Sequence, residues 1–361
     1  MKNKYYNLNK ILNKNAHYNI IIGERSNGKT YAVLEYALKK YVETGEQLAI
    51  LRRWKEDFTG KRGQQLFNAL ENNGLISKLT GGEWSNIYYY SSRWFLCRYE
   101  NDKRIQNETP FAFGFNLSSM EHDKSTSYPN VTTILFDEFL TRSMYLPDEF
   151  VLYMNTLSTI IRERNNVKIF MLGNTVNKYC PYFKEMGLNH VKNMHQGDID
   201  VYQYGETGLM VAVEYCHPLN RNGKQSDLYF AFDNPKLRMI KSGTWEIDIY
   251  PHCPVKYKPI EILFTYFIKF NENILQCEII QHGNTPFTYI HQKTTELKAP
   301  DTDLIFSNDV DVRYNWRTNI LKPILPVEKK ILKYFTENKV FYQDNETGEI
   351  VRNYLNFCKT L

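Results

Sequence analysis

Residues 20–30 form a short segment whose pattern requires a tight loop between a strand and a helix. It reads IIIGERSNGKT, an apolar β-type run that ends at Gly23 and is followed four residues later by Gly28, Lys29 and Thr30. This is the phosphate-binding pattern G-x-x-x-x-G-K-[ST]. Glycines permit the tight turn that aims backbone N–H groups at a polyphosphate, and a helix beginning there presents its positive dipole end to the same anion. Because the next ten residues have helical spacing, the segment predicts a strand, a loop and a helix in that order.

The predicted loop gives its residues distinct roles toward a nucleotide. The Lys29 ammonium is expected between the β- and γ-phosphates of ATP, and the Thr30 hydroxyl is expected on Mg²⁺. The alternative is a chance glycine-rich turn, against which the order of strand, loop and helix argues. The sequence therefore predicts ATP and Mg²⁺ as cofactors, with ATP bound by the whole loop: Gly23, Glu24, Arg25, Ser26, Asn27, Gly28, Lys29 and Thr30.

Length and charge narrow the class of protein. With 361 residues, 42% of them hydrophobic, the chain is long for one core and two domains are expected. The net charge of +5 permits a polyanionic partner without requiring one. No signal peptide opens the sequence and no apolar run is long enough to span a bilayer. We therefore expect an intracellular protein with no membrane partner.

The pattern of the chain changes near its middle. The first half alternates β-type and helical runs, which predicts an α/β domain with a parallel sheet and crossover helices. Residues 198–235 are polar and predict a linker, and the following β-type runs, separated by hairpin turns, predict an antiparallel meander. We expect a P-loop ATPase domain at 1–197, a linker at 198–235 and a smaller α+β domain at 236–361. The expected strands are 17–22, 47–52, 94–99, 111–115, 132–136, 167–172, 262–270, 274–281 and 288–292, and the expected helices are 29–40, 63–72, 148–162 and 327–335.

A second motif lies at residues 132–138, which read TTILFDE. An apolar strand that delivers two carboxylates at its end is what a Walker B element requires, with Asp137 on Mg²⁺ and Glu138 as the base that polarises the attacking water. An ordinary strand ending in a polar turn is the alternative. Together with the upstream loop, the adjacent acids favour a hydrolysing motor over a small-molecule kinase.

Further candidates for the nucleotide site are polar residues near the end of a later predicted helix and of the strand that follows it. Arg162 and Arg164 follow a predicted helix, where either can act as an arginine finger in a neighbouring subunit or simply cap a solvated helix end. Asn174 ends the next predicted strand, as a γ-phosphate sensor or as a turn residue.

Basic residues cluster after the second predicted strand. Arg52, Arg53 and Lys55 flank Trp54, and Lys61 and Arg62 follow shortly. Positive charge beside an aromatic ring is compatible with gripping a phosphate backbone, whereas charge runs are usually solvated surface.

The order of these motifs resembles the DNA-encapsidation ATPases of small tailed phages of the phi29 type. Three blocks carry the resemblance, at residues 22–32, at 45–47 with 52–55, and at 124–139. The resemblance implies a ring, pentameric in the family, that drives double-stranded DNA into a procapsid from its portal. It implies a homo-oligomer in the host cytoplasm, transiently on the procapsid, with a structural packaging RNA as an additional partner.

The resemblance also implies roles for single residues. Lys29 and Thr30 correspond to ATP and Mg²⁺ ligands, Asp137 to the Mg²⁺ carboxylate and Glu138 to the catalytic glutamate. Arg162 corresponds to the trans-acting finger, with Arg164 as its alternative. Lys124 corresponds to a lysine that acts across the subunit boundary, and Lys55 to one near the DNA, to which we add Lys61 and Arg62 as candidate contacts.

The second domain of the family resembles a ribonuclease H fold without its nuclease acids. The predicted first strand, residues 262–270, carries no carboxylate, and a two-metal nuclease needs one there. Asp301, Asp303, Asp309 and Asp311 are therefore expected to be solvated loop acids, and the domain to dock rather than cleave. Two alternatives stay open: a terminase-type packaging ATPase with an active nuclease domain, and a non-hydrolysing module whose docking surface is gated by nucleotide.

Overall fold

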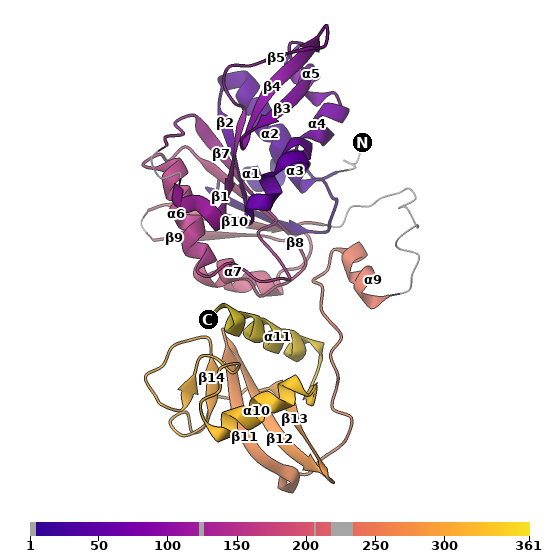
Figure 1. The fold of residues 1–361 in the computed structure, drawn as a ribbon, viewed down its shortest axis with the longest axis vertical. Coiled ribbons are helices and arrows are strands. Elements are labelled where there is room, and N and C mark those ends of the chain that lie inside the picture. Colours follow the sequence, from indigo (N-terminus) through magenta and orange to yellow (C-terminus); the bar gives the residue numbers. More distant parts are fainter. Residues whose placement is uncertain (1–4, 123–125, 206, 218–233) are drawn as a thin grey trace. The chain divides into compact units, whose positions relative to one another are not determined.

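The computed structural model describes residues 5–122, 126–205, 207–217 and 234–361 and divides into two compact units, Met1–Glu246 and Ile247–Leu361 (Figure 1). Lys124 lies outside the described residues. Among the helices of the described ranges, none combines the length and apolar character needed to span a membrane.

The first unit is built on a ten-stranded sheet of order β3-β4-β6-β2-β7-β8-β1-β10-β9, with β5 paired to β4. The strands from β6 to β10 along this path are parallel, and β3, β4, β5 and β9 pair antiparallel at the two edges. The bounds are β1 Tyr18–Gly23, β2 Gln47–Arg52, β3 Asn86–Tyr90, β4 Arg93–Glu100, β5 Lys103–Gln106, β6 Ala112–Asn116, β7 Val131–Asp137, β8 Lys168–Asn174, β9 Ile199–Tyr204 and β10 Leu209–Tyr215.

Helices cover both faces of this sheet and form a hydrophobic core on each. One core joins the sheet to α2 (Lys29–Thr44), α4 (Asn68–Asn72) and α5 (Leu75–Leu79). The other joins it to α6 (Glu149–Ile161) and α7 (Pro181–Glu185). Burial on both faces explains why the central strands read as continuous apolar runs. The remaining helical segments are α1 Asn9–Leu12, η1 Lys55–Phe58, α3 Gly60–Gln65, η2 Leu117–His122, η3 Asn189–Asn193 and α9 Pro235–Ser242.

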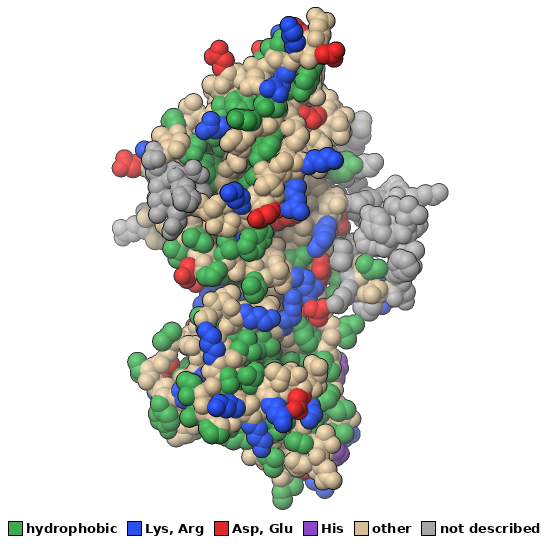
Figure 2. Space-filling model, viewed as in Figure 1, with side chains coloured by type: hydrophobic (Ala, Val, Ile, Leu, Met, Phe, Trp, Pro, Cys, Tyr) green, Lys and Arg blue, Asp and Glu red, His purple; other side chains and the backbone are tan. Residues whose placement is uncertain are grey.

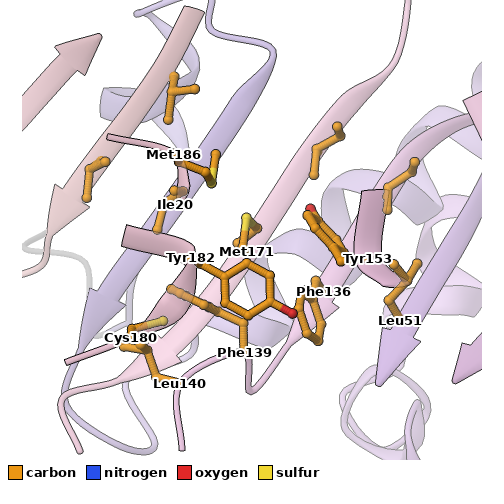
Figure 3. Close-up of a cluster of buried hydrophobic side chains, with 14 of the residues drawn as sticks. Ile20, Leu51, Phe136, Phe139, Leu140, Tyr153, Met171, Cys180, Tyr182 and Met186 are labelled. Atoms are coloured by element: carbon orange, nitrogen blue, oxygen red, sulfur yellow. The ribbon is translucent and has the colours of Figure 1, made fainter. Parts of the chain in front are cut away.

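Aromatic rings dominate the core beneath α6 and α7 (Figure 3). Tyr182 packs edge-on against Phe136, Phe139 and Tyr153, with ring centroids 5.5–5.8 Å apart. Phe136 and Phe139 flank the two acids of the Walker B pattern in sequence. The core therefore fixes the end of β7, where those acids emerge.

The second unit contains a six-stranded sheet of order β15-β14-β11-β12-β13-β16, in which β12 alone runs antiparallel to its described neighbours. Its strands are β11 Ile262–Phe270, β12 Asn273–His282, β13 Thr285–Gln292, β14 Ile305–Ser307, β15 Trp316–Arg317 and β16 Val340–Tyr342, and its helical segments are η4 Pro259–Glu261, α10 Pro326–Thr336 and α11 Asn345–Thr360. The predicted meander is β11–β13, and the predicted helix at 327–335 is α10. The Asp344 side chain caps α11 by accepting a hydrogen bond from the Thr347 N–H.

The structure confirms the parallel α/β fold of the first unit and corrects several details of its organisation. The expected helix at 63–72 is two short helices, α3 and α4. The expected linker begins with β9 and β10, which belong to the first sheet, and its residues 218–233 lie outside the described ranges. β9 read as polar because it is an edge strand with alternate residues exposed. The two units divide after Glu246 rather than at the predicted limits of 197 and 236.

Candidate functional site

The phosphate-binding pattern forms a strand, a loop and a helix as predicted. β1 lies between β8 and β10, and α2 begins at Lys29. Gly28 has φ +92°, in the left-handed region that glycine adopts without strain. A Cβ at Gly23 would lie 2.9 Å from the Cβ of Cys216, so the neighbouring strand β10 leaves no room for a side chain there.

Lys29 is buried in the loop, and its ammonium is held by loop carbonyls. Its Nζ donates to the carbonyl oxygens of Gly23 at 3.3 Å and Glu24 at 2.7 Å, and to Asn174 Oδ1 at 3.4 Å. Burial lowers the pKa of Lys29, while the nearby Asp137 and Glu24 oppose that shift. Asn174 at the end of β8 therefore belongs to the same site as the loop.

Thr30, at the start of α2, and Asp137, at the end of β7, face each other. The Thr30 hydroxyl lies 3.3 Å from Asp137 Oδ1 and 3.2 Å from Oδ2. Asp137 is buried, and this desolvation raises the pKa of its carboxyl, although the Arg52 charge opposes the shift. The hydroxyl and the carboxylate are the hard oxygen donors that Mg²⁺ prefers.

Glu138 leaves the strand in an unusual backbone conformation. Its φ is +60° and its side chain is 65% exposed, so the carboxylate points out of the core at the mouth of the site. Arg52, at the end of the neighbouring β2, donates to Glu138 Oε2 at 2.7 Å and to Asp137 Oδ2 at 2.9 Å. The guanidinium thus bridges the two acids.

Arg52 and Arg53 correct the expectation of an outward-facing basic cluster. Arg52 faces the acids of β7, and Arg53 is buried in an ion pair with Glu149 of α6, with N–O distances of 2.7 and 2.8 Å. Arg53 Nη2 also donates to the Phe139 carbonyl at 2.8 Å. Both side chains turn inward because β2 lies beside β7. The carboxylates at the end of β7 bind Arg52, and the Phe139 carbonyl and Glu149 bind Arg53.

The remaining basic candidates are exposed. Lys55 lies in η1, and Lys61 and Arg62 lie in α3, all with exposed side chains. Arg62 Nη1 is 3.9 Å from Asp57, a weak surface pair.

The structure separates the two finger candidates. Arg164 donates to five backbone carbonyls, those of Pro129, Val131, Tyr128, Ile160 and Ile161, at 2.6–3.2 Å. It therefore anchors the end of α6 to the start of β7. Arg162 is exposed, and its side chain donates a hydrogen bond to the Thr126 carbonyl at 3.2 Å.

The P-loop and the ends of β7 and β8 line a pocket of about 430 Å³, within the usual range for small-molecule sites. The structure thus brings together the P-loop, Asp137, Glu138 and Asn174. Arg162, Lys55, Lys61 and Arg62 do not line this pocket. The lining residues are 25–31, 137–138 and 172–174.

Two segments lie against the P-loop region although the sequence did not predict their contacts with it. At the N-terminal end, the Tyr6 N–H donates to the Asn27 carbonyl at 3.0 Å. At the far end of the unit, Gly243 lies against Glu24, and the Glu246 N–H donates to the Thr175 carbonyl at 2.9 Å. Neither segment carries a local pattern that signals this placement, because both contacts depend on the fold.

A lysine-bearing loop between a buried parallel strand and a helix, facing an aspartate at the end of the next strand but one in the sheet, defines a P-loop nucleotide-binding fold. Residues 1–204 match the podovirus DNA encapsidation protein (Gp16) family, and the chain belongs to that family. The resemblance drawn from the motifs is therefore confirmed.

Individual relatives agree with this assignment. The chain is 29% identical over 185 residues to the DNA packaging protein of Bacillus phage phi29, covering 50% of each chain, and 31% identical over 173 residues to that of Bacillus phage B103, covering 47% of this chain and 48% of the relative. The chain matches about half the length of these curated relatives.

Two solved structures share the fold along nearly the whole chain. A subunit of the bacteriophage Phi-29 viral genome packaging motor assembly has a TM-score of 0.57 and 20% identity, covering 99% of this chain and 100% of that one. A subunit of the Phi-28 gp11 DNA packaging motor has a TM-score of 0.55 and 18% identity, covering 99% of both chains.

Proposed function

We propose that this protein is an ATP-driven motor that translocates double-stranded viral DNA into a procapsid. The observation that carries the proposal is the convergence of Lys29, Thr30, Asp137 and Glu138 on one pocket. A loop for phosphates, oxygen donors for a cation and a separate exposed carboxylate are the parts that phosphoryl transfer to water requires. The family indicates that the motor moves DNA, because the related chains are DNA packaging proteins.

The residues present fit ATP with Mg²⁺. Thr30 and Asp137 offer oxygen atoms to one point, and Lys29 can exchange its loop carbonyls for phosphate oxygens. The ion, when bound, neutralises the charge that develops on the phosphates. The P-loop N–H groups and the start of α2 add further positive potential at the same place.

Glu138 is proposed as the general base. Its exposed carboxylate can accept a proton from water at Oε2, the oxygen to which Arg52 donates a hydrogen bond in this structure. Arg52 must therefore release Glu138, or share it, before that oxygen is available to water. Asn174 is proposed to orient the γ-phosphate or the attacking water, because its amide already contacts Lys29.

Arg162 is proposed as the trans-acting finger of a homo-oligomeric ring, pentameric as in the family. Its exposed side chain can exchange one backbone carbonyl for a neighbour's phosphate oxygens, whereas Arg164 is held by five. Such an arginine stabilises the transition state and makes hydrolysis depend on assembly. Lys124, also a candidate to act across the subunit boundary, remains a proposal from the resemblance.

DNA-stimulated ATP hydrolysis tests the proposal directly. Glu138→Gln should abolish turnover while ATP still binds, and full turnover by this variant would contradict the mechanism. Arg162→Ala should be inactive alone, yet mixing it with Glu138→Gln subunits should restore part of the activity, because each variant supplies what the other lacks. Absence of rescue at every ratio would argue against a shared site. Sustained phosphate release by the wild type would also exclude the non-hydrolysing module.

The exposed cations Lys55, Lys61 and Arg62 are proposed contacts to the DNA backbone. Replacing all three by alanine should weaken duplex binding uniformly across sequences and flatten its salt dependence, because backbone contacts carry no base information. The expected setting is the host cytoplasm and, transiently, the portal of a procapsid, with a structural RNA as a further partner.

The second unit is proposed to be a ribonuclease H-like docking domain. Its first five strands have the spatial order 3-2-1-4-5, with the second strand antiparallel to the others. Three of the four loop acids are paired with bases: Asp301 and Asp311 with Arg313, and Asp309 with Lys269. Plasmid incubated with the protein and Mg²⁺ or Mn²⁺ should stay uncut; cleavage would favour the terminase-type alternative.

A further inference from the structure

One edge of the first sheet carries an aromatic and basic surface away from the nucleotide pocket. β3, β4 and β5 form two tight hairpins, and alternate residues point to opposite sides. One side supplies Ile87, Trp94 and Leu96 to the core shared with α2, α4 and α5. The other side, which we call the β3–β5 face, carries Tyr88, Tyr90, Arg93, Phe95, Tyr99 and Arg104, as the cross-strand register requires.

Much of this face is open to solvent. Tyr90 is 65% and Tyr99 59% exposed, and Arg93 and Arg104 are exposed as well. Figure 2 shows apolar and basic side chains, with acidic ones among them, over the region that β3, β4 and β5 occupy in Figure 1. Large aromatic side chains gathered on a surface mark a binding site more often than scattered ones do.

The aromatic side chains are already ordered with respect to one another. Arg104 Cζ lies 3.4 Å from the centroid of the Tyr88 ring, a cation–π contact. The rings of Tyr88 and Tyr90 are nearly parallel, at 10°, with centroids 6.5 Å apart. The three side chains therefore form a row that ends at the most exposed ring, Tyr90.

The charge of the face favours an anion. Arg93 is the cross-strand partner of Tyr90, and it forms no ion pair with any of the described residues. Glu100 points to the other side of β4, where it pairs with Arg98 at 2.7 Å, and Asp102 lies in the turn between β4 and β5. The strand positions on the β3–β5 face thus carry aromatic rings and guanidinium groups and no carboxylate.

We propose that the β3–β5 face binds single-stranded nucleic acid. A base stacks on Tyr90 and extends the row formed with Tyr88 and Arg104, while Arg93 contacts the adjoining phosphate. A duplex keeps its base faces stacked inside and cannot use Tyr90 in this way. A two-fold pairing of this face with a second copy would bring the same arginines against each other, which charge repulsion opposes.

Fluorescence anisotropy with labelled 12-nucleotide oligo(U), oligo(dT) and a duplex of equal length tests this site in the full-length protein. Tyr90→Ala should weaken binding of both single strands about tenfold and leave the duplex unchanged. Tyr90→Phe, which keeps the ring, should bind like the wild type. A tighter complex with oligo(U) than with oligo(dT) would identify RNA as the source of the strand, and the reverse order DNA.

Matched variants separate this site from others. Tyr314→Ala removes an exposed tyrosine of the second unit and should have no effect, and Lys29→Ala should keep single-strand binding even if it abolishes ATP binding. The proposal is wrong if Tyr90→Ala and Tyr314→Ala bind the single strands alike. It is also wrong if Tyr90→Ala changes self-association in sedimentation while oligonucleotide affinity stays constant, since the face would then join copies of the chain.

Discussion

Arg52 holds Glu138 by an ion pair, with Nη1 2.7 Å from Oε2, while its other terminal nitrogen lies 2.9 Å from Asp137. The Arg52 side chain is 15% exposed and that of Asp137 is 8% exposed. Two adjacent carboxylates repel each other, and a buried one is costly without a partner. Arg52 therefore stabilises the acids in the nucleotide-free protein.

Arg52→Ala should destabilise the nucleotide-free protein by about 2 kcal/mol, because Asp137 loses its closest cation. Bound ATP with Mg²⁺ brings a positive charge to the same carboxylate, so the loss should shrink when unfolding is measured with a non-hydrolysable ATP analogue. Thermal unfolding of both states provides the measurement. Arg317→Ala is the matched control: it removes the partner of the buried Glu328 in the second unit, whereas the pocket is lined by residues 25–31, 137–138 and 172–174, so its loss should be equal in the two states. Equal losses for Arg52→Ala would refute the role given to Arg52.

Arg164 and Arg162 should differ in what their removal costs. Arg164→Ala removes the side-chain donor from carbonyls at the end of α6 and the start of β7 and should lower the free energy of unfolding by about 2–3 kcal/mol. Arg162→Ala should change it by less than about 0.5 kcal/mol, as is usual at exposed positions. Urea unfolding followed by circular dichroism checks both. A stable Arg164→Ala protein would return Arg164 to the list of finger candidates.

The sequence predicted the strand, loop and helix of the P-loop and the strand that leads to Asp137, because these elements are local patterns. The P-loop needs only a strand, a loop and a helix that are consecutive in the chain, and the continuous apolar run before Asp137 identified a central strand. Asn174 was expected at the end of a strand, and β8 does end there, beside the loop; its role toward the γ-phosphate stays a prediction.

What the sequence could not predict depends on which strands are neighbours. Arg52 and Arg53 looked like surface charge because nothing local shows that β2 lies beside β7. Arg162 and Arg164 have the same local context, yet the turn after Ile161 buries only the second one among carbonyls. β9 escaped prediction because an edge strand reads as polar, and β10 because its parallel partner β1 lies nearly two hundred residues earlier.

Gly243 should control nucleotide affinity from outside the pocket. Its φ is +66°, and a Cβ there would lie 2.9 Å from Glu24 Cβ and 3.2 Å from Glu24 N. Gly243→Ala should therefore push the P-loop backbone and weaken binding of a fluorescent ATP analogue about tenfold. Gly208→Ala is the control: φ is +67° but the added Cβ would meet nothing within 4 Å, so it bears a similar backbone strain of about 1 kcal/mol without touching the loop. Equal affinities for the two variants would rule out the contact as the cause.

The sheet of the second unit should lose stability as the pH rises above neutrality. His291 Nε2 lies 3.6 Å from Glu278 Oε1, and this partner raises the pKa of His291 above 6.5 although burial opposes the shift. A raised pKa means that the contribution of His291 is complete below pH 6.5 and is lost as the pH rises through the pKa of the folded state. Burial raises the pKa of Glu278, but hydrogen bonds from His291, Tyr257 and Gln276 outweigh it, so the net shift is downward from 4.5. The contribution of Glu278 is therefore complete above pH 4.5 and lost only in acid.

Hydrogen exchange of β12 and β13, corrected for the intrinsic effect of pH, measures this in the full-length protein. Protection should be highest between about pH 4.5 and 6.5 and should fall toward pH 8 as His291 loses its proton. His291→Gln should remove the decline above pH 6.5, whereas His195→Gln, at a solvent-exposed position of the first unit, should keep it. A decline that persists in His291→Gln would mean that another group in the second unit titrates.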